Sequence, residues 1–239
     1  MKLTKYGLKE WLVGGIISII LLGLCMVLVF YFNKPQVGYP LAALVCIVYF
    51  ALAAFFRDPK RKIPEDGNVL VSPADGLIKD IELVKGEDEN SFFNNQDTIR
   101  VGIFLSVLNV HLNRAPCDIT VKDKKYRKGK YHDARSPLAS KENEAMTIFC
   151  EGKALDKTFP LIVRQISGAI AKRIVCDAEP DKSFKKGERF GMIKFGSRTE
   201  LYLPAEQWMN LTVKIGDKVC AGETVVARLN SDMKPKTKK

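Results

Sequence analysis

The sequence predicts a mainly β domain preceded by a transmembrane helical hairpin. Two observations support this fold class. Two long apolar runs without a charged side chain occupy most of the first 56 residues, and short β-type runs separated by turn residues follow them. Nearly all of the 38 Lys and Arg and 27 Asp and Glu side chains come after residue 56. This later part, about 180 residues long, is large enough to bury a core of its own.

The two apolar runs, residues 11–32 and 36–56, favour membrane spans. Each is long enough to cross a hydrocarbon core of about 30 Å at about 1.5 Å per helical residue. Only Asn33, Lys34 and Pro35 separate them, which suits a tight turn between two helices. A secretory signal peptide fits the first run poorly, because the run exceeds the usual ~7–15 apolar residues and no small-residue cleavage site follows it. Two buried core helices are the other alternative, although runs this long without charge favour lipid.

Basic residues outside the two runs predict the orientation of the hairpin. The connecting loop holds only Lys34, whereas the outer flanks hold Lys2, Lys5, Lys9, Arg57, Lys60, Arg61 and Lys62. By the positive-inside rule, both termini lie in the cytoplasm. We therefore expect a two-pass protein of the cell membrane. Residues 1–62 form the hairpin and a basic joint, and residues 63–239 form a cytoplasmic domain.

The formal net charge of +11 raises the alternative of a nucleic-acid-binding protein. A bilayer explains this charge at least as well, because anionic headgroups attract juxtamembrane Lys and Arg by about 1 kcal/mol each. No helix-turn-helix, zinc-finger or aromatic RNA-binding motif accompanies the charge. Six scattered cysteines without a Cys-x-x-Cys pair, and two histidines in all, argue against a metal site and for reduced thiols. We expect the bilayer as partner, with neither nucleic acid nor metal.

The pattern after residue 62 predicts short strands. No long apolar stripe of helical period appears there, and β-type runs recur at 68–72, 98–105, 145–150, 160–166 and 173–176. One internal echo stands out, because residues 181–193 and 217–227 each join Asp-Lys to Gly-Glu and a β-rich stretch. The two units look like halves of a biotinyl/lipoyl-type barrel-sandwich. Two turn–strand units in any β-rich protein can also look alike.

Three segments hold residues suited to chemistry: RFGMIKFGSRTELYLP (189–204), SPADG (72–76) and LSVLNVHLNRAP (105–116). The first places Ser197 after Gly196, which lacks a Cβ and so permits close approach of a nucleophile. The second places Asp75 in a turn, and the third places His111 beside a β-type run. Taken singly, each has a structural interpretation, as a turn serine, a turn-capping carboxylate and a buried structural histidine.

Together with the hairpin and GAIAKRIVC (168–176), these segments resemble the phosphatidylserine decarboxylase family. The similarity is closest to its short, membrane-hairpin branch, which also includes archaetidylserine decarboxylases, and it covers nearly the whole chain. It implies a pyruvoyl-dependent carboxy-lyase of phospholipid biosynthesis that converts phosphatidylserine to phosphatidylethanolamine and CO2 through a Schiff base. It also implies a proenzyme that cuts itself between Gly196 and Ser197. The products would be a long chain, 1–196, and a short chain, 197–239, which begins with a covalent pyruvoyl group made from Ser197.

The resemblance also implies roles for individual residues. His111 would take the proton of Ser197 Oγ as that oxygen attacks the Gly196 carbonyl, and Asp75 would hold the imidazole in the right tautomer. His111 is also the candidate that returns a proton to the substrate carbon. The longer branch carries a His-x-x-His pair here, whereas this chain has Arg114 at the second position. Arg114 would bind the substrate carboxylate or phosphate, or form a structural ion pair.

The sequence is compatible with other interpretations. A membrane-anchored barrel-sandwich adaptor without catalysis would keep its chain intact and would be indifferent to Ser197→Ala. A membrane-bound serine hydrolase would use Ser197, His111 and Asp75, but the sequence lacks the Gly-x-Ser-x-Gly elbow. An archaetidylserine decarboxylase would use the same headgroup chemistry, and a homo-oligomer is compatible with the sequence. His132, in a polar segment, is expected in a mobile or substrate-covering loop.

Overall fold

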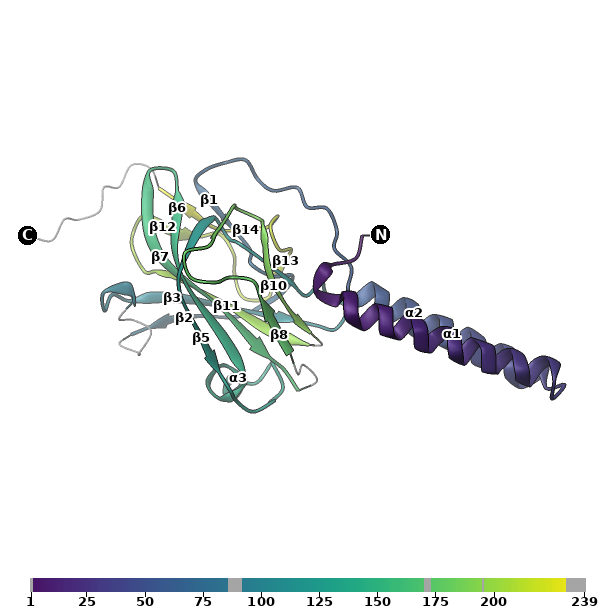
Figure 1. Ribbon diagram of the computed structural model, residues 1–239. Coiled ribbons are helices and arrows are strands. Elements are labelled where there is room, and N and C mark those ends of the chain that lie inside the picture. The colour runs from purple at the N-terminus through teal and green to yellow at the C-terminus, as the bar shows by residue number, and fades with distance from the viewer. Residues whose placement is uncertain (1, 86–91, 170–172, 195, 231–239) are drawn as a thin grey trace, which may run out of the picture. The chain divides into compact units, whose positions relative to one another are not determined.

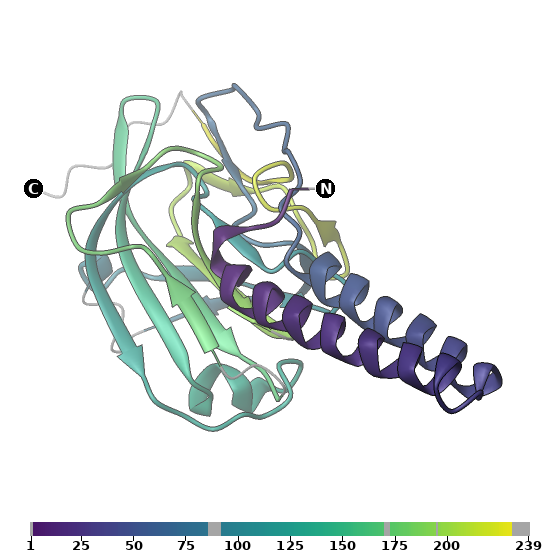
Figure 2. The same ribbon diagram turned by 45° about the vertical axis from the view of Figure 1, so that its right-hand side comes forward.

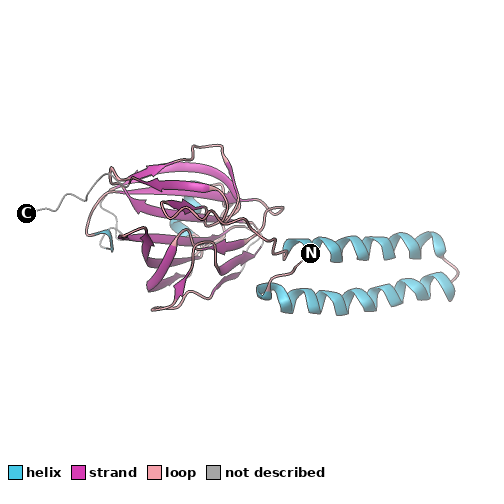
Figure 3. Ribbon diagram, turned by 90° about the horizontal axis from the view of Figure 1, so that it is seen from above, coloured by secondary structure: helices cyan, strands magenta, loops and turns pink. Residues whose placement is uncertain are grey.

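The computed structural model describes residues 2–85, 92–169, 173–194 and 196–230. It divides into two compact units, Met1–Pro59 and Lys60–Lys239. The first unit is helical, and the second is built mainly from strands (Figures 1 and 3). The predicted fold class is therefore confirmed, and the boundary between the units lies within the basic stretch that follows the second apolar run.

The first unit is a helical hairpin. Its elements are η1 (Lys5–Gly7), α1 (Leu8–Phe30) and α2 (Pro35–Phe55). The two long helices lie side by side (Figure 2), and both are long and apolar enough to cross a membrane. Pro35 suits the first turn of α2, where its missing N–H would have no partner. A Cβ on Gly38 would lie 2.8 Å from the Cys25 carbonyl oxygen, so the close approach of the two backbones depends on this glycine.

The second unit contains an antiparallel sheet of eight strands, in the order β13-β2-β3-β11-β7-β6-β5-β9. Two three-stranded sheets, β1-β14-β12 and β4-β10-β8, complete it together with the short helix α3 (Pro137–Glu142). The strands are β1 (Val69–Val71), β2 (Gly76–Val84), β3 (Thr98–Leu105), β4 (Leu112–Arg114), β5 (Asp118–Arg127), β6 (Ala145–Ala154), β7 (Lys157–Ser167), β8 (Arg173–Cys176), β9 (Ser183–Phe184), β10 (Arg189–Lys194), β11 (Ser197–Pro204), β12 (Met209–Leu211), β13 (Lys218–Val219) and β14 (Val225–Leu229).

Strand β11 is the centre of the large sheet, and all of its residues are buried. It pairs with β3 on one side and with β7 on the other (Figure 1). Because side chains alternate along a strand, Ser197 shares a face with Leu201 and Leu203, which lie in the main hydrophobic core. Arg198 and Glu200 point to the other face. The first residue of β11 therefore faces the interior between the sheets.

The echo in the sequence corresponds to two turns with the same geometry. Gly187 and Gly222 have φ angles of +76° and +78°, a left-handed conformation that favours glycine. The Gly187 amide donates to the Ala115 carbonyl at 2.8 Å, and the Gly222 amide donates to the Ser72 carbonyl at 2.9 Å. The two turns thus attach to matching stretches, Ser-Pro-Ala-Asp at 72–75 and Ala-Pro-Cys-Asp at 115–118. The domain therefore contains an internal repeat of turn and strand.

Candidate active site

A closed turn after β3 positions His111. Asn109 Oδ1 accepts hydrogen bonds from Ser106 N at 2.9 Å and from Ser106 Oγ at 2.8 Å. His111 follows this turn and is fully buried, and its Nδ1 lies 2.9 Å from the Asn109 carbonyl oxygen. A carbonyl oxygen only accepts, so Nδ1 carries the proton in the neutral ring. Nε2 is then the basic nitrogen.

That basic nitrogen points at Gly196. His111 Nε2 accepts a hydrogen bond from the Gly196 amide at 3.2 Å. Gly196 has a φ of +69°, which favours glycine. A Cβ on Gly168 would lie 2.5 Å from the Gly196 carbonyl oxygen, so that carbonyl packs closely against β7 and its following turn. The backbone just before Ser197 is therefore held between an imidazole base and a tightly packed strand end.

Ser197 itself carries a buried hydroxyl without a hydrogen-bond partner among the described residues. Ser167 of β7 lies directly opposite it in the register, so the two side chains share one face. Ser167 Oγ is buried and lacks a partner in the described chain as well, as does Gln165 Oε1 on the same face. Each such group costs about 1–3 kcal/mol. Sequence reasoning missed Ser167, because only the strand register brings it beside Ser197.

Asn113 attaches the histidine segment to the central strands. Its Nδ2 donates to Thr199 Oγ1 at 2.9 Å, and its Oδ1 accepts from Gln165 Nε2 at 2.8 Å. Asn113 is fully buried, so these bonds are shielded from water. They connect β4 to both β11 and β7, and they fix the strand that follows His111.

The structure does not bring Asp75 to His111. Arg61 Nη2 donates to Asp75 Oδ1 at 2.9 Å and to Oδ2 at 2.7 Å, and the Ala221 amide donates to Oδ1 at 2.8 Å. The Asn109 carbonyl occupies the position on Nδ1 that the resemblance assigned to Asp75. The physical reason is that the Arg61 guanidinium of the joint satisfies this carboxylate locally.

The internal repeat gives Asp75 a counterpart. Asp118 lies three residues after Ala115, as Asp75 lies three residues after Ser72. Asp118 Oδ1 accepts from the Lys186 amide at 2.9 Å, just as Asp75 accepts from the corresponding amide of the other turn. Two matching carboxylates thus cap two matching turns, which is the structural interpretation of Asp75.

The remaining sequence candidates lie elsewhere. Arg114 is buried and donates from Nη1 to the Gly187 carbonyl oxygen at 2.9 Å. It is not among the residues that line the pocket at Gly196. His132 is half-buried, and its Nε2 lies 3.0 Å from Glu142 Oε2. Neither side chain contacts Gly196 or Ser197 through a recorded hydrogen bond in the described part of the chain.

A pocket of about 180 Å³ opens at Gly196. Its charged lining residues are Asp133 and Arg135, which pair through Arg135 Nη2 and Asp133 Oδ2 at 2.5 Å. Hydrogen bonds from Arg135 lower the pKa of Asp133 to about 2. The other lining residues are Phe104, Leu105, Ser106, Val107, Ala134, Gly168, Ala169 and Gly196. Among the described residues, the pocket therefore offers one exposed guanidinium, paired with Asp133, beside a mainly apolar and backbone lining.

Asn143 fastens the segment that carries this arginine. Its Nδ2 donates to the carbonyls of His132 and Ser167, both at 2.8 Å, and its Oδ1 accepts from the His132 amide at 2.8 Å. The segment is not loop throughout, because Ser136 caps α3 and Pro137 occupies its first turn. The polar segment around His132 thus reaches the pocket through Arg135. The one sequence signal that could have pointed to Arg135 was its place in this polar segment.

The face of β11 opposite Ser197 holds a paired charge network. Glu200 is fully buried and accepts hydrogen bonds from Arg198 Nε at 2.8 Å, from Tyr202 OH at 2.9 Å and from Ser140 Oγ. Burial raises the pKa of Glu200, but Arg198, Arg164 and Arg100 outweigh this effect, and the net pKa is lowered. The carboxylate therefore stays ionised and ties β11 to its neighbours.

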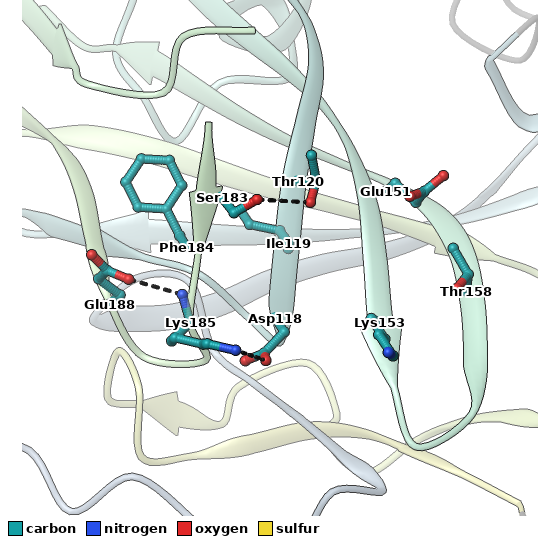
Figure 4. Close-up of a pocket in the computed structure, with 10 residues that line it drawn as sticks. All are labelled: Asp118, Ile119, Thr120, Glu151, Lys153, Thr158, Ser183, Phe184, Lys185 and Glu188. Atoms are coloured by element: carbon teal, nitrogen blue, oxygen red, sulfur yellow. Dashed lines mark hydrogen bonds and ion pairs between the residues drawn. The ribbon is translucent and has the colours of Figure 1, made fainter. Parts of the chain in front are cut away.

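A second hollow, of about 250 Å³, lies beside β5 and β9 (Figure 4). Four of its polar side chains form two pairs, since Lys185 Nζ lies 2.9 Å from Asp118 Oδ2 and Thr120 Oγ1 lies 3.0 Å from Ser183 Oγ. None of the residues around Gly196 lines it. The candidate site is therefore the smaller pocket.

Comparison with known proteins identifies the family of the chain. The family model described as phosphatidylserine decarboxylase matches residues 49–227. A phosphatidylserine decarboxylase proenzyme of Wolbachia pipientis wMel is 44% identical over 178 residues, which cover 74% of this chain and 75% of that protein. The Rhodopirellula baltica protein of the same name is 38% identical over 94% of this chain and 87% of its own length. The Ehrlichia chaffeensis one is 40% identical over 82% and 84%. The chain belongs to the phosphatidylserine decarboxylase family.

Proposed function

We propose that this chain is a membrane-anchored phosphatidylserine decarboxylase that cleaves itself between Gly196 and Ser197 and acts through a pyruvoyl group made from Ser197. One observation carries the proposal. A buried serine hydroxyl without a recorded partner among the described residues follows a left-handed glycine whose amide donates to the basic nitrogen of His111. The relatives, which are named proenzymes, supply the independent support.

Self-cleavage uses the chain's own groups. Ser197 Oγ gives its proton to His111 Nε2 and attacks the Gly196 carbonyl carbon, and the Gly196–Ser197 amide bond breaks as an ester forms. Loss of the Cα proton then expels the Gly196 carboxylate from Cβ, which leaves dehydroalanine at residue 197. Water replaces the amino nitrogen of residue 197, and ammonia leaves. One water is consumed, and residue 197 ends as a pyruvoyl group.

The residues around Ser197 fit such a group. The Ser197 side chain is fully buried beside the pocket at Gly196. The Ser167 hydroxyl lies opposite it in the strand register, on the same face of the sheet, and is a hydrogen-bond donor. The pyruvoyl group supplies the carbonyls that bind the substrate amine and accept the electron pair released with CO2. Arg135 suits the substrate phosphate or carboxylate, and His111 holds the proton that the product carbon needs.

Cleavage leaves both chains in one fold. The short chain would contain β11 to β14, and β11 pairs with β3 and β7 of the long chain along nearly its whole length. The strands β13 and β14 also pair with long-chain strands. The backbone hydrogen bonds of these ladders hold the two products together after the covalent link is lost.

Membrane anchoring suits the substrate. The two apolar helices keep the domain at the bilayer that contains the lipid, and the basic flanks of the hairpin favour a cytoplasmic domain. A serine hydrolase would bind its substrate at an uncut Ser197, and in the uncut chain this hydroxyl is fully buried. The burial instead suits attack on the chain itself.

The test is a decarboxylation assay on purified protein in mixed micelles. Phosphatidylserine labelled at the serine carboxyl should release labelled CO2 with wild type and not with Ser197→Ala. Diacyl and diether lipids are compared in parallel, since the proposal names the diacyl lipid as substrate. A folded and processed wild type that releases no label from either lipid would contradict the proposed function.

A further inference from the structure

The turn that positions His111 also presents an apolar tip. Val107 is 50% exposed and Leu108 is 81% exposed, and both lie between Ser106 and Asn109. Val107 lines the pocket at Gly196, so the tip borders the mouth of the candidate site. A single exposed leucine is ordinary on a protein surface. Two adjacent exposed apolar side chains at the entrance of a site for lipid favour a contact with lipid.

Hydrogen bonds between Ser106 and Asn109 close the turn that carries the tip. The Asn109 amide donates to the Ser106 carbonyl at 2.9 Å, and Asn109 Oδ1 accepts from both the amide and the hydroxyl of Ser106. The Asn109 carbonyl in turn holds His111 Nδ1. Leu108 is 81% exposed, so an apolar surface beyond the described part of the chain would bury most of its side chain.

We propose that Val107 and Leu108 insert into the interfacial layer of the bilayer, beside the lipid whose headgroup occupies the pocket. This inference rests on the proposed function. A phospholipid keeps its acyl chains in the bilayer, so the mouth of its headgroup pocket must meet the membrane surface. The same pocket holds the exposed Arg135–Asp133 pair, whose guanidinium has the geometry to donate to an anionic headgroup.

The bilayer is favoured over a protein partner. The four residues of the turn carry no charge that would specify a protein surface, and the same chain provides two apolar helices that anchor it to lipid. Rigid presentation matters here, because an ordered apolar tip enters a membrane interface without first losing conformational freedom. The tip would thereby set the height of the pocket above the acyl chains.

The experiment compares two lipid presentations with Leu108→Ser. On phosphatidylserine vesicles, kcat/KM should fall roughly tenfold, the loss expected for one leucine that no longer enters an apolar phase. On a short-chain phosphatidylserine below its micelle concentration, kcat/KM should stay at the wild-type value. Leu108→Trp should retain the vesicle activity. Self-cleavage, read by intact mass, should be complete in every variant.

Leu155→Ser is the matched control, because Leu155 is a turn leucine 44% exposed at the opposite end of β7 from Ser167. It should leave both activities unchanged. An equal loss on vesicles and on the short-chain lipid, or no loss on either, overturns the inference while the proposed function stands. A wild type without activity on either lipid overturns the proposed function, and this inference with it.

Discussion

The two faces of β11 carry buried polar groups of opposite character. On one face, Glu200 accepts hydrogen bonds from Arg198, Tyr202 and Ser140. On the other face, Ser197 Oγ and Ser167 Oγ are equally buried and have no recorded partner in the described residues. Both faces belong to one strand and one sheet, so the contrast does not come from their position in the fold.

This difference in pairing distinguishes buried groups that stabilise the fold from buried groups that take part in a reaction. Buried polar groups that are fully paired hold strands in register, and removing one partner leaves another group desolvated and unpaired. Buried groups without partners cost free energy in the folded state, so they point to a reaction or a ligand rather than to folding. The comparison therefore predicts that loss of a paired group such as Glu200 lowers stability, whereas loss of the Ser197 or Ser167 hydroxyl changes processing.

The largest effect is expected at His111. His111→Ala removes the base beside Gly196, and self-cleavage should slow by about 10²–10⁴-fold, the usual contribution of a positioned general base. A cell-free synthesis into nanodiscs, stopped at intervals in detergent, gives the ratio of uncut to cut chain. His132→Ala is the control and should cleave at the wild-type rate. Equal slowing in both variants would show that His111 is not the general base of self-cleavage.

Glu200→Gln should give the next largest effect, on stability. The change leaves Arg198, Arg164 and Arg100 without their buried anion and should destabilise the domain by about 3–5 kcal/mol. For a domain of this size, that is roughly 10 °C in Tm. Thermal unfolding of the Ser197→Ala chain, with and without Glu200→Gln, measures it. Glu82→Gln is the control, because Glu82 pairs with Arg100 from an exposed position.

The same carboxylate predicts a pH dependence. The pKa of Glu200 in the folded chain lies below its ordinary value of 4.5, since three arginines outweigh the effect of burial. Its stabilisation is therefore complete above that ordinary value and is lost as the pH falls through the lower folded value. The difference in Tm between the Ser197→Ala chains with and without Glu200→Gln should shrink as the pH falls below 4.5. A difference that stays constant across this range would contradict the assignment.

A smaller effect is expected at Arg135. Arg135→Gln removes the one guanidinium that lines the pocket in the described chain and should raise KM for phosphatidylserine about tenfold, the cost of one hydrogen bond to a charged group. Self-cleavage should be unchanged, because the recorded hydrogen bonds of the Arg135 side chain go to Asp133. Lys128→Gln, on the same segment, is the control. An unchanged KM in Arg135→Gln would show that the headgroup binds elsewhere.

The smallest effect is expected at Ser167, and it gives the most direct comparison of the two faces of β11. Ser167→Ala removes a hydroxyl that lacks a recorded partner in the described chain, so stability should stay constant or rise. Self-cleavage should slow about two- to fivefold, by no more than the ~1 kcal/mol of a typical hydrogen bond. Ser140→Ala removes a hydroxyl that donates to Glu200, so it should lower stability and leave the rate of self-cleavage unchanged. Unfolding curves and cleavage time courses on both variants decide it. The same phenotype in both would abolish the distinction between the faces.

The sequence predicted the parts of this protein that depend on local pattern. Runs without charge indicated the hairpin, and β-type runs indicated the strands, because both signals come from neighbouring residues. Ser197 and His111 were predicted together, and the structure places the imidazole at Gly196. The short helix α3 was missed, although Ser136 and Pro137 are a start signal for a helix.

The parts that were not predicted depend on register and on contacts distant in the chain. Asp75 meets Arg61 rather than His111, and nothing in the turn sequence distinguishes these two partners. The Asn109 carbonyl orients the imidazole. Because every residue has a backbone carbonyl, the residue types do not predict this contact. Ser167 becomes notable only once β7 is aligned with β11. Long-range pairing therefore decides the details of the site.

Intact mass of the purified protein tests the central claim most directly. Wild type should give two chains divided after Gly196, and the short chain should begin with a pyruvoyl group and resist amino-terminal sequencing. Ser197→Ala should give one full-length chain. A single full-length mass for folded wild-type protein would contradict the account, because Ser197 would then remain a serine.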